Sequence, residues 1–170
     1  MTTTTTPGLE FALVKESDLD ELMDLELAGY PADEAATPAS MAKRVAEAGD
    51  IFLVARPASG GPIVAFVCST RTSSVEYTHE AMEQHEAGTS SVCIHSVCVD
   101  KRWRRRGVAR AALAEYVRRC GDGSFVNVKR AMLICKEHLI PLYKGAGFTL
   151  VGPSAVVHGQ DPWFDMAMDF

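Results

Sequence analysis

The chain has 170 residues, 47% of them hydrophobic, and its 22 acidic residues against 17 basic ones give a formal net charge of -5. This length favours one domain that buries roughly 70% of the surface of its unfolded chain. No apolar run approaches the roughly 20 residues of a membrane span, and the start "MTTTTTPGLE" lacks the basic and apolar regions of a secretory signal. An acidic surface repels a long polyanion, so we expect neither a membrane nor a nucleic acid as partner.

Five cysteines are present, at positions 68, 93, 98, 120 and 135. An odd count within apolar runs is typical of buried free thiols in a reducing compartment, so we expect a cytoplasmic protein. The segment "CIHSVC" brings Cys93, His95 and Cys98 close together. In a regular strand Cys93 and His95 share one face while Cys98 points to the other, so we expect no metal site.

The first quarter of the chain predicts one strand and two helices. We expect a flexible tail over residues 1–8 and a strand over 9–15. An acidic amphipathic helix is expected over 18–28, with Ser17 as its N-cap. After a loop with two prolines, a second helix is expected over 41–49.

The next segments predict a β-meander. Two β-branched apolar runs, 51–55 and 62–70, flank Gly60 and Gly61, which is a hairpin signature. A polar segment follows and predicts a long loop with a short helix. The run 91–99 then predicts a strong strand.

The last third predicts alternating helices and strands. Apolar residues at three-and-four spacing indicate a helix over 108–120, followed by a buried strand over 131–135 and a short helix within 137–148. Two strands with a turn at "GQDP" are expected within 149–170. In sum, we expect one α/β domain over 9–170, with a mixed sheet of about seven strands flanked by about four helices.

The stretch "KRWRRRGVAR" (101–110) places six basic side chains in ten positions of an acidic chain. It connects a predicted strand to a predicted helix, and the first turn of a helix carries unpaired backbone N–H groups and the positive end of the helix dipole. The small residues Gly107 and Ala109 let a ligand approach the backbone closely. This turn therefore predicts a site for a small phosphate-bearing ligand.

Arg104, Gly107 and Ala109 form an R-x-x-G-x-A pattern at this turn, and "PLYKGAGF" follows further along the chain. The combination resembles the GNAT superfamily of acyl-CoA-dependent N-acetyltransferases. "CIHSVCVDKRWRRRGVARAAL" and "AMLICKEHLIPLYKGAGFTLVGPSAV" are similar to arylalkylamine (serotonin) N-acetyltransferases, and "YPADEAA" and "THEAMEQH" are similar to their fungal or non-vertebrate members. The resemblance covers most of residues 10–170 and implies the GNAT fold with acetyl-CoA as cosubstrate.

The resemblance also implies which residues hold acetyl-CoA. The turn would hold the diphosphate, the backbone of the preceding strand would pair with the pantetheine arm, and Tyr143 would lie beside the thioester sulfur. A phenol is protonated at neutral pH and can donate to a leaving thiolate, although a tyrosine that only packs its helix is the alternative. The implied residues are Val97, Cys98, Val99, Arg104, Arg105, Arg106, Gly107, Val108, Ala109, Arg110, Tyr143 and Lys144.

His95 is the implied general base, because an amine must lose a proton before it attacks a thioester and imidazole titrates near pH ~6.5. Vertebrate members carry two histidines on this strand, and Cys93 replaces the first of them here. We therefore expect His95 to act alone through waters. Tyr30, Pro31, Cys93 and Trp163 are the implied substrate-binding residues, with aromatic rings stacking on an aryl group, although Trp163 in a merely structural role is the alternative.

These residues predict an enzyme that acetylates the primary amine of an arylalkylamine, such as serotonin, tryptamine or phenylethylamine, by direct attack in a ternary complex. A polyamine substrate is the alternative, since acidic residues at 33, 34, 76, 80, 83 and 86 can attract a polycation. A non-catalytic CoA-binding module is a further alternative. We expect a monomer, and no basic-x-Thr site in the N-terminal tail supports a phosphorylation-dependent adaptor partner.

Overall fold

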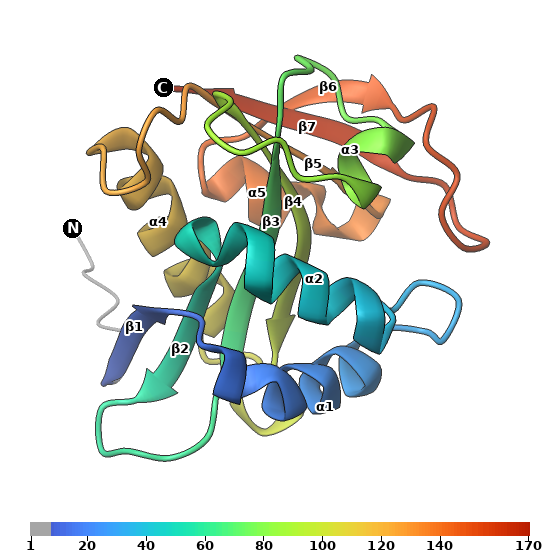
Figure 1. Cartoon of the computed structure of the whole chain (residues 1–170). Helices are drawn as coiled ribbons and strands as arrows, with labels where there is room; N and C mark the ends of the chain where they lie inside the picture. Colours follow the sequence, from blue (N-terminus) through green and yellow to red (C-terminus); the bar gives the residue numbers. More distant parts are fainter. Residues whose placement is uncertain (1–7) are drawn as a thin grey trace.

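A seven-stranded sheet forms the centre of the computed structural model, which describes residues 8–170; the tail predicted over residues 1–8 lies almost wholly outside them. The strand order is β1-β2-β3-β4-β5-β7-β6 (Figure 1). β4 and β5 pair in parallel, and the other neighbours pair antiparallel. The strands are β1 (Leu9–Leu13), β2 (Leu53–Pro57), β3 (Ala65–Thr72), β4 (Ser91–Val99), β5 (Arg130–Cys135), β6 (Thr149–Pro153) and β7 (Phe164–Asp169).

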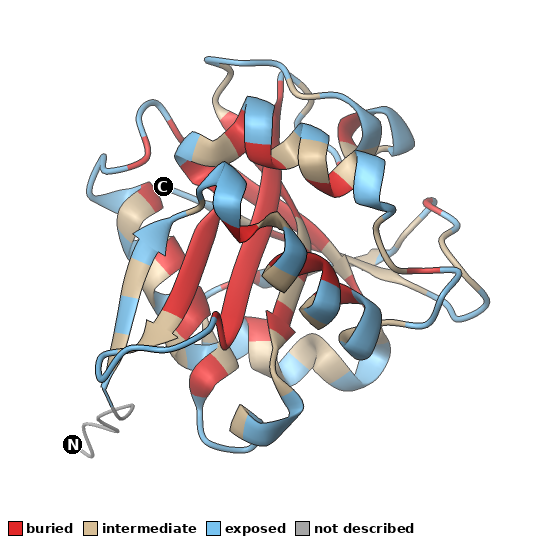
Figure 2. Ribbon diagram, turned by 60° about the horizontal axis from the view of Figure 1, so that its bottom comes forward, coloured by how far each residue is buried: buried red, intermediate tan, exposed pale blue. Residues whose placement is uncertain are grey.

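Helices cover both faces of the sheet, so its central strands are buried on both sides (Figure 2). α1 and α2 pack against one face, and α4 and α5 pack against the other. The helices are α1 (Leu19–Gly29), α2 (Pro38–Ala48), α3 (His79–Glu83), α4 (Val108–Gly121) and α5 (Ile140–Gly145). The predicted mixed α/β sheet of seven strands is confirmed. Five helices flank it instead of about four, because α3 forms in the segment predicted as a long loop with a short helix.

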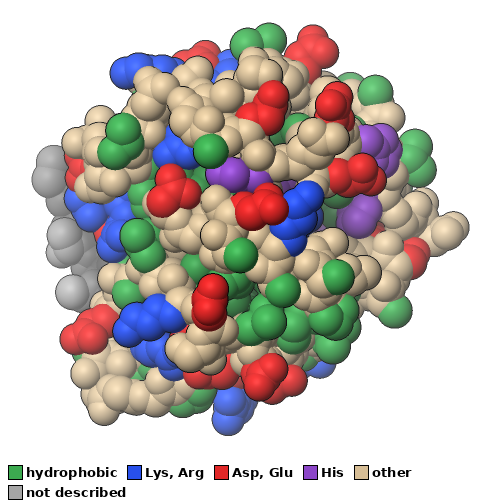
Figure 3. All heavy atoms as spheres, viewed as in Figure 1, with side chains coloured by type: hydrophobic (Ala, Val, Ile, Leu, Met, Phe, Trp, Pro, Cys, Tyr) green, Lys and Arg blue, Asp and Glu red, His purple; other side chains and the backbone are tan. Residues whose placement is uncertain are grey.

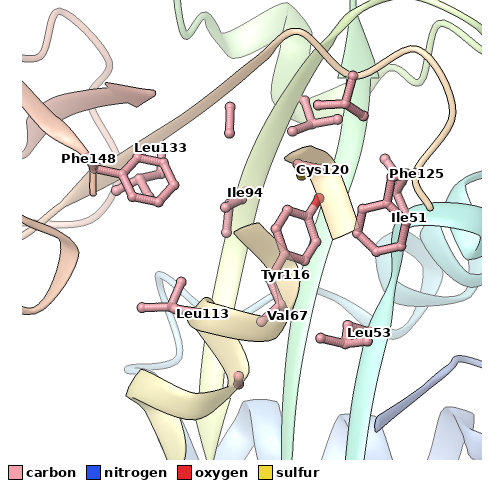
Figure 4. Packing of buried hydrophobic residues seen from close by; sticks show 14 of the residues in the cluster. Ile51, Leu53, Val67, Ile94, Leu113, Tyr116, Cys120, Phe125, Leu133 and Phe148 are labelled. Atoms are coloured by element: carbon pink, nitrogen blue, oxygen red, sulfur yellow. The ribbon is translucent and has the colours of Figure 1, made fainter. Parts of the chain in front are cut away.

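The larger core lies between the sheet and α4, as Figure 4 shows. Tyr116 of α4 is fully buried there, with its ring edge-on to Phe125 at a centroid distance of 5.1 Å. Its hydroxyl lies 2.5 Å from the Ser69 hydroxyl, which donates to the Ile51 carbonyl oxygen at 2.8 Å. The polar atoms of this buried tyrosine are therefore satisfied, as burial requires.

The second core lies under α1 and α2 and contains one buried carboxylate. Glu26 of α1 is 1% exposed, and its Oε1 accepts from the Ala36 N–H at 3.0 Å and from the Ser96 hydroxyl at 3.1 Å. Burial raises the pKa of Glu26, while these two hydrogen bonds lower it in part. The carboxylate thus ties α1 to the loop before α2 and to β4.

Two helix starts differ from the prediction. Ser17 is not the N-cap of the first helix, because it lies in a 3₁₀ turn, Glu16–Asp18, and α1 begins after Asp18. The Asp18 carboxylate does not cap α1, since it accepts from the Lys15 N–H at 2.9 Å and from Arg56 at 2.8 Å.

The second helix begins three residues earlier than predicted. Thr37 is its N-cap and accepts from the Ser40 N–H at 3.1 Å, and Pro38 occupies the first helical position, where no N–H is needed. Within residues 8–170 no helix has the length and apolar character to cross a membrane.

Candidate active site

The sheet splits between its two parallel strands. β4 pairs with β5 only from Ser91 opposite Arg130 to Ile94 opposite Leu133. Beyond Ile94, β4 continues to Val99 along β3 alone. One edge of β4 is therefore free of a neighbouring strand from His95 onward, and the two cavities described below open at this edge.

His95 lies at a β-bulge where this split begins. Along β3, Cys68 pairs with Ser96 and the next residue, Ser69, pairs with Ile94, so His95 is skipped in the register. A bulge bends the strand and redirects side chains, which here turns two successive residues, His95 and Ser96, away from the α4 face. The His95 ring enters a cavity, and the Ser96 hydroxyl bonds α1.

The bulge also changes which residues share a face of β4. Cys98 packs against α1, where its Sγ lies 3.2 Å from the Leu25 carbonyl oxygen, and Cys93 faces the same side under Tyr77. The alternation assumed for a regular strand was therefore wrong for Cys98. Even so, no group of three His, Cys, Asp or Glu side chains within residues 8–170 is placed to hold a metal ion.

A long groove of about 970 Å³ runs between the split edge of β4, the start of α4, and α5. Ten of the twelve residues expected to hold acetyl-CoA line it: Val97, Cys98, Val99, Arg104, Arg105, Gly107, Val108, Ala109, Arg110 and Tyr143. The other two lie outside its lining. The guanidinium of Arg106 stacks over the Trp103 ring at 5.5 Å, and Lys144 is exposed on α5.

One end of the groove has the geometry of an anion site. Gly107 is the N-cap of α4 in the left-handed conformation (φ 76°), and Arg105 two residues earlier also has positive φ (60°). No side chain caps α4, so its first backbone N–H groups are not engaged by a cap. Left-handed turns at a helix start create a concave set of N–H groups that suits phosphate oxygens.

The six basic side chains of the turn divide into two sets. Arg104, Arg105 and Arg110 line the groove. Arg102 instead forms an ion pair with Asp100 at 2.9 Å, Arg106 stacks on Trp103, and Lys101 is exposed. Half of the basic charge at this turn is therefore available to a ligand in the groove.

The free edge of β4 already carries two side-chain hydrogen bonds. The Tyr30 hydroxyl donates to the Val97 carbonyl oxygen at 3.3 Å, and Arg104 Nε donates to the Val99 carbonyl oxygen at 3.2 Å. A carbonyl oxygen has two lone pairs, so both can accept a further hydrogen bond. An extended ligand along this edge would lie beside Tyr30 and Arg104.

A smaller cavity of about 190 Å³ adjoins the groove and is called the acceptor cavity here. Seven of its nineteen lining residues carry an aromatic or imidazole ring: Tyr30, Tyr77, His95, His138, Tyr143, His158 and Trp163. The groove and the acceptor cavity share six lining residues: Gly29, Tyr30, Val97, His138, Leu139 and Tyr143. The two cavities therefore adjoin along these six residues, which include Tyr30 and Tyr143.

His95 is held by two hydroxyl groups. Its Nε2 lies 2.7 Å from the Thr70 hydroxyl, and its Nδ1 lies 3.1 Å from the Tyr77 hydroxyl. Burial is the main cause that lowers the pKa of His95 well below its usual value near 6.5, and electrostatic interactions with Arg44 and His158 lower it further. His95 is therefore a neutral imidazole at pH 7.

A polar cavity of about 500 Å³ lies behind Thr70, between α2 and α3. Three other histidines, His79, His85 and His158, line it together with Arg44. Histidine side chains appear beside acidic and basic ones on this face of the molecule (Figure 3). The Thr70 hydroxyl therefore separates His95 from a second, more open polar space.

Two loops far apart in the sequence close the acceptor cavity. Glu34 from the loop before α2 has a side chain only 4% exposed and pairs with Lys136 at 3.0 Å; Lys136 also pairs with Asp161 at 2.9 Å. His158 Nε2 lies 2.9 Å from the Glu34 carbonyl oxygen. These contacts connect the loop before α2 to the end of β5 and to the loop between β6 and β7.

The predicted substrate-binding residues separate into two groups. Tyr30, Pro31 and Trp163 line the acceptor cavity, whereas Cys93 does not. Cys93 is fully buried under Tyr77, and burial raises the pKa of its thiol to about 12. The Trp163 ring already contacts Lys136 Nζ at 5.7 Å from its centroid and the His158 ring at 5.6 Å, so part of its surface is covered.

Sequence reasoning missed Tyr77 and Thr70, the two partners of His95. Thr70 lies in the segment predicted as a strand, and Tyr77 lies in the segment predicted as a long loop with a short helix. A local signal was available, because a threonine with an acidic residue in the turn after it, here Thr78 and Glu80, is typical of a helix start, and Thr78 does accept from the Ala81 N–H at 3.1 Å. This pattern indicates that a helix begins after Tyr77, but it does not predict that the Tyr77 hydroxyl contacts His95.

Comparisons with known proteins agree with this geometry. The acetyltransferase (GNAT) domain family matches residues 24–170. Serotonin N-acetyltransferase from Mesocricetus auratus is 32% identical over 100 residues, which are 59% of this chain and 47% of that protein. The chain thus spans about half the length of the curated relatives it matches. The predicted resemblance to serotonin N-acetyltransferases is confirmed at this modest identity.

Solved structures of low identity share the fold. The loading GNATL domain of CurA from Lyngbya majuscula has a TM-score of 0.81 at 11% identity, covering 95% of this chain and 97% of that chain. Arabidopsis thaliana NAA60 in complex with acetyl-CoA has a TM-score of 0.72 at 20% identity, covering 95% and 99%. The predicted fold is confirmed. At these low identities the similarity shows the fold alone and does not identify an amine substrate.

Proposed function

This chain belongs to the GNAT family of acetyltransferases, and on that premise we propose that it acetylates the primary amine of arylalkylamines. Tryptamine, serotonin and phenylethylamine represent the substrate class. The acetyl group comes from acetyl-CoA, and the amine attacks the thioester directly while both substrates are bound. We further propose that the enzyme works in the cytoplasm on a small-molecule amine, because all five cysteines are free and buried thiols. The monomeric state and the single domain over 9–170 stay predictions.

The observation that carries the proposal is the junction of the groove and the acceptor cavity at Tyr30 and Tyr143. A thioester at the end of the groove would lie within reach of an amine in the acceptor cavity, which is what direct transfer requires. The aromatic lining of the acceptor cavity supports an aryl substrate, because aromatic pairs contribute about 0.5–1.5 kcal/mol beyond their buried area.

Acetyl-CoA fits the groove on the chemistry of its lining. The diphosphate would bind the left-handed turn at Gly107 together with Arg104, Arg105 and Arg110. The amides of the pantetheine arm would meet the carbonyl oxygens on the free edge of β4. Serotonin N-acetyltransferases are among the curated relatives, which supports an acetyl donor as cosubstrate.

Two residues carry the proton transfers in this proposal. His95, neutral at rest, receives the proton that the amine loses. As the amine nitrogen bonds the carbonyl carbon and the carbon–sulfur bond breaks, Tyr143 donates its phenol proton to the departing thiolate. The second proton on the former amine nitrogen then passes to the Tyr143 oxygen, so the products are a neutral amide and a neutral thiol and the phenol is restored. Burial raises the pKa of Tyr143, so the phenol is protonated and able to donate throughout the neutral range.

A polyamine is less well supported, because the acidic residues that favoured it do not converge on the acceptor cavity. Glu83 lines the cavity behind Thr70, and Glu80 and Glu86 line a separate surface cavity. Asp33 and Glu76 are exposed and are not among the lining residues of the acceptor cavity. Glu34 alone of the six lines it, and its carboxylate already forms an ion pair with Lys136.

A CoA-binding module without activity is also less well supported. Such a module needs the groove but has no use for a second cavity that brings His95 and Tyr143 to the end of the groove. The same two cavities are what a transferase requires, so the enzyme is the proposal that uses all of the site.

Thiol release from acetyl-CoA tests the substrate class. We expect kcat/KM for tryptamine, serotonin and phenylethylamine to exceed that for putrescine and spermine by about tenfold or more, which corresponds to ~1.4 kcal/mol. Lysine serves as the control amine without an aryl ring. Preference for spermine would keep the acetyl transfer and overturn the arylalkylamine assignment, and no turnover with any amine would contradict the proposed activity itself.

A further inference from the structure

Among the residues 8–170 that line the acceptor cavity, Tyr77 is the one whose side chain lies within hydrogen-bond distance of the His95 ring. Its ring is 8% exposed and lies edge-on to the imidazole, with centroids 6.2 Å apart and planes at 66°. Its hydroxyl lies 3.1 Å from His95 Nδ1. Tyr77 precedes α3, so this contact depends on how the segment between β3 and β4 folds back over the bulge.

The hydrogen bonds of the Thr70 hydroxyl show which nitrogen of the His95 imidazole carries the proton. Thr70 Oγ1 donates its one proton to the Ala81 carbonyl oxygen at 2.9 Å. At its other contact, 2.7 Å from His95 Nε2, the same oxygen can therefore only accept, so the proton of the neutral ring is on Nε2. Nδ1 then holds the lone pair, and the Tyr77 hydroxyl donates to it.

Both nitrogens of His95 are thus occupied by the protein. The basic one, Nδ1, faces the Tyr77 hydroxyl, and an amine in the acceptor cavity would have to displace that hydroxyl to reach it. We infer that Tyr77 carries the proton from the substrate amine to His95, as a relay between them. This inference rests on the proposed function and adds a third catalytic residue to it.

The relay balances in protons and charge. One N–H bond of the substrate ammonium breaks and an O–H bond forms on Tyr77, while the original O–H bond of Tyr77 breaks and an N–H bond forms on His95 Nδ1. The amine gains the lone pair that attacks the thioester, His95 becomes an imidazolium, and Tyr77 ends as a neutral phenol. The new N–H of His95 still points at the Tyr77 oxygen, which can accept from it.

The surroundings of Tyr77 favour a coupled transfer over a phenolate. Burial is the main cause that raises its pKa, and the nearby Cys93 adds to this, while Arg44 lowers it. A phenol in this position does not lose its proton unless it gains another in the same step. Burial is the main cause that keeps His95 neutral at rest, and electrostatic interactions with Arg44 and His158 add to it. Glu34, Lys136, Tyr143 and His158 line the same cavity.

The test compares the full-length protein with its Tyr77→Phe variant in acetyl-CoA turnover with tryptamine from pH 7 to about 9.5. At pH 7 we expect kcat to fall about 10–100-fold, with the KM for acetyl-CoA within twofold of wild type, since proton transfer by a positioned group contributes about that much or more. The deficit should shrink steadily as the pH rises to 9.5, because the free-base fraction of an alkylamine with a pKa near ~10.4 rises from about 0.04% at pH 7 to about 11% at pH 9.5.

Tyr116→Phe is the matched control, because it also removes a buried tyrosine hydroxyl with one partner but lies on the opposite face of the sheet. It should leave kcat and its pH dependence unchanged. A second measurement places Tyr77→Phe in a His95→Gln background, where it should cost no further activity if Tyr77 acts through His95.

Two results would overturn the relay while keeping the proposed function: a Tyr77→Phe enzyme as active as wild type at pH 7, or one reduced by the same factor at every pH, which indicates a structural effect only. Additive losses in the double variant would also count against it. A wild-type protein that acetylates no amine would remove the proposed function and the relay together.

Discussion

Tyr143 lies where the groove and the acceptor cavity meet, and it lines both. Its ring is 7% exposed and packs edge-on against Phe148 at 6.1 Å, which fixes its direction. Among the residues that the structure describes, its hydroxyl has no hydrogen-bond partner. A protonated phenol placed in this way is available to a leaving thiolate.

Replacing this phenol tests its role as acid. In Tyr143→Phe we expect kcat to fall about 10–100-fold, because the thiolate would depart without a proton donor, and the KM for acetyl-CoA to change little. Steady-state kinetics with saturating tryptamine measures both, with Tyr116→Phe as the control for loss of a buried hydroxyl. Equal kcat in variant and wild type would exclude Tyr143 as the acid.

The roles of single residues could be predicted from the sequence only where the chemistry of the side chain and its place in a family motif indicated the role. His95 and Tyr143 could be named because an imidazole and a phenol at those places match the family pattern. The contact of His95 with Tyr77 could not, since it requires the bulge that skips His95 in the β3 register and the fold of the intervening loop. Cys93 was expected to contact substrate because the family resemblance places the first histidine of the vertebrate members at this position, but here it is buried under Tyr77.

At the scale of elements, the turn between β4 and α4 combines backbone strain with charge. Gly107 needs its positive φ of 76°, and a Cβ added there would meet no other atom within 4 Å. The open space beside it is the diphosphate end of the groove in our proposal. A methyl group at this position would therefore strain the turn and enter the ligand's space.

Gly107→Ala separates these two effects when it is compared with Gly123→Ala. Gly123 also has positive φ (83°) and open space, but it lies in the loop after α4, outside the lining of the groove. Each substitution should lower the free energy of unfolding by about 1 kcal/mol. Only Gly107→Ala should raise the KM for acetyl-CoA, by about tenfold, and equal KM values in the two variants would contradict a ligand at this turn.

Elements with a strong apolar pattern were predicted to within a few residues, because burial on both faces of a central strand gives a continuous apolar run. The strand over 91–99 and the helix after Gly107 are examples. The first residues of helices were less predictable, because a side chain that could cap a helix can instead bind other donors. Asp18 does not cap α1 because Lys15 and Arg56 already bind its carboxylate.

At the scale of the whole molecule, the site exists because β4 and β5 separate after Ile94 and because two distant loops close the gap. No local pattern encodes this separation, so the sequence could suggest the two substrates but not that their cavities adjoin. The same packing buries His95 in neutral form, and that burial links the site to the stability of the fold.

Burial of neutral His95 predicts a pH dependence of stability. The folded-state pKa lies below 6.5, so between that pKa and 6.5 the unfolded chain binds more protons than the folded one. The free energy of unfolding should therefore fall as the pH falls below about 6.5, and it should fall less in His95→Gln. His85 has a lowered pKa for the same reason and will leave a residual slope.

Urea unfolding of wild type and His95→Gln at pH 5.5, 6.5 and 7.5 measures this difference. His138→Gln is the control, because His138 also lines the site but belongs to a 3₁₀ turn that is more open to solvent. An identical pH slope in wild type and His95→Gln would contradict a neutral buried imidazole.

In the proposed function, acetyl transfer occurs directly where the groove and the acceptor cavity adjoin, with both substrates bound at the same time. Initial rates of thiol release, measured over a grid of tryptamine and acetyl-CoA concentrations, test it most directly. Direct transfer predicts double-reciprocal lines that intersect, because both substrates must be bound before reaction. Parallel lines would indicate an acetylated enzyme intermediate, and they would contradict direct transfer between the two bound substrates.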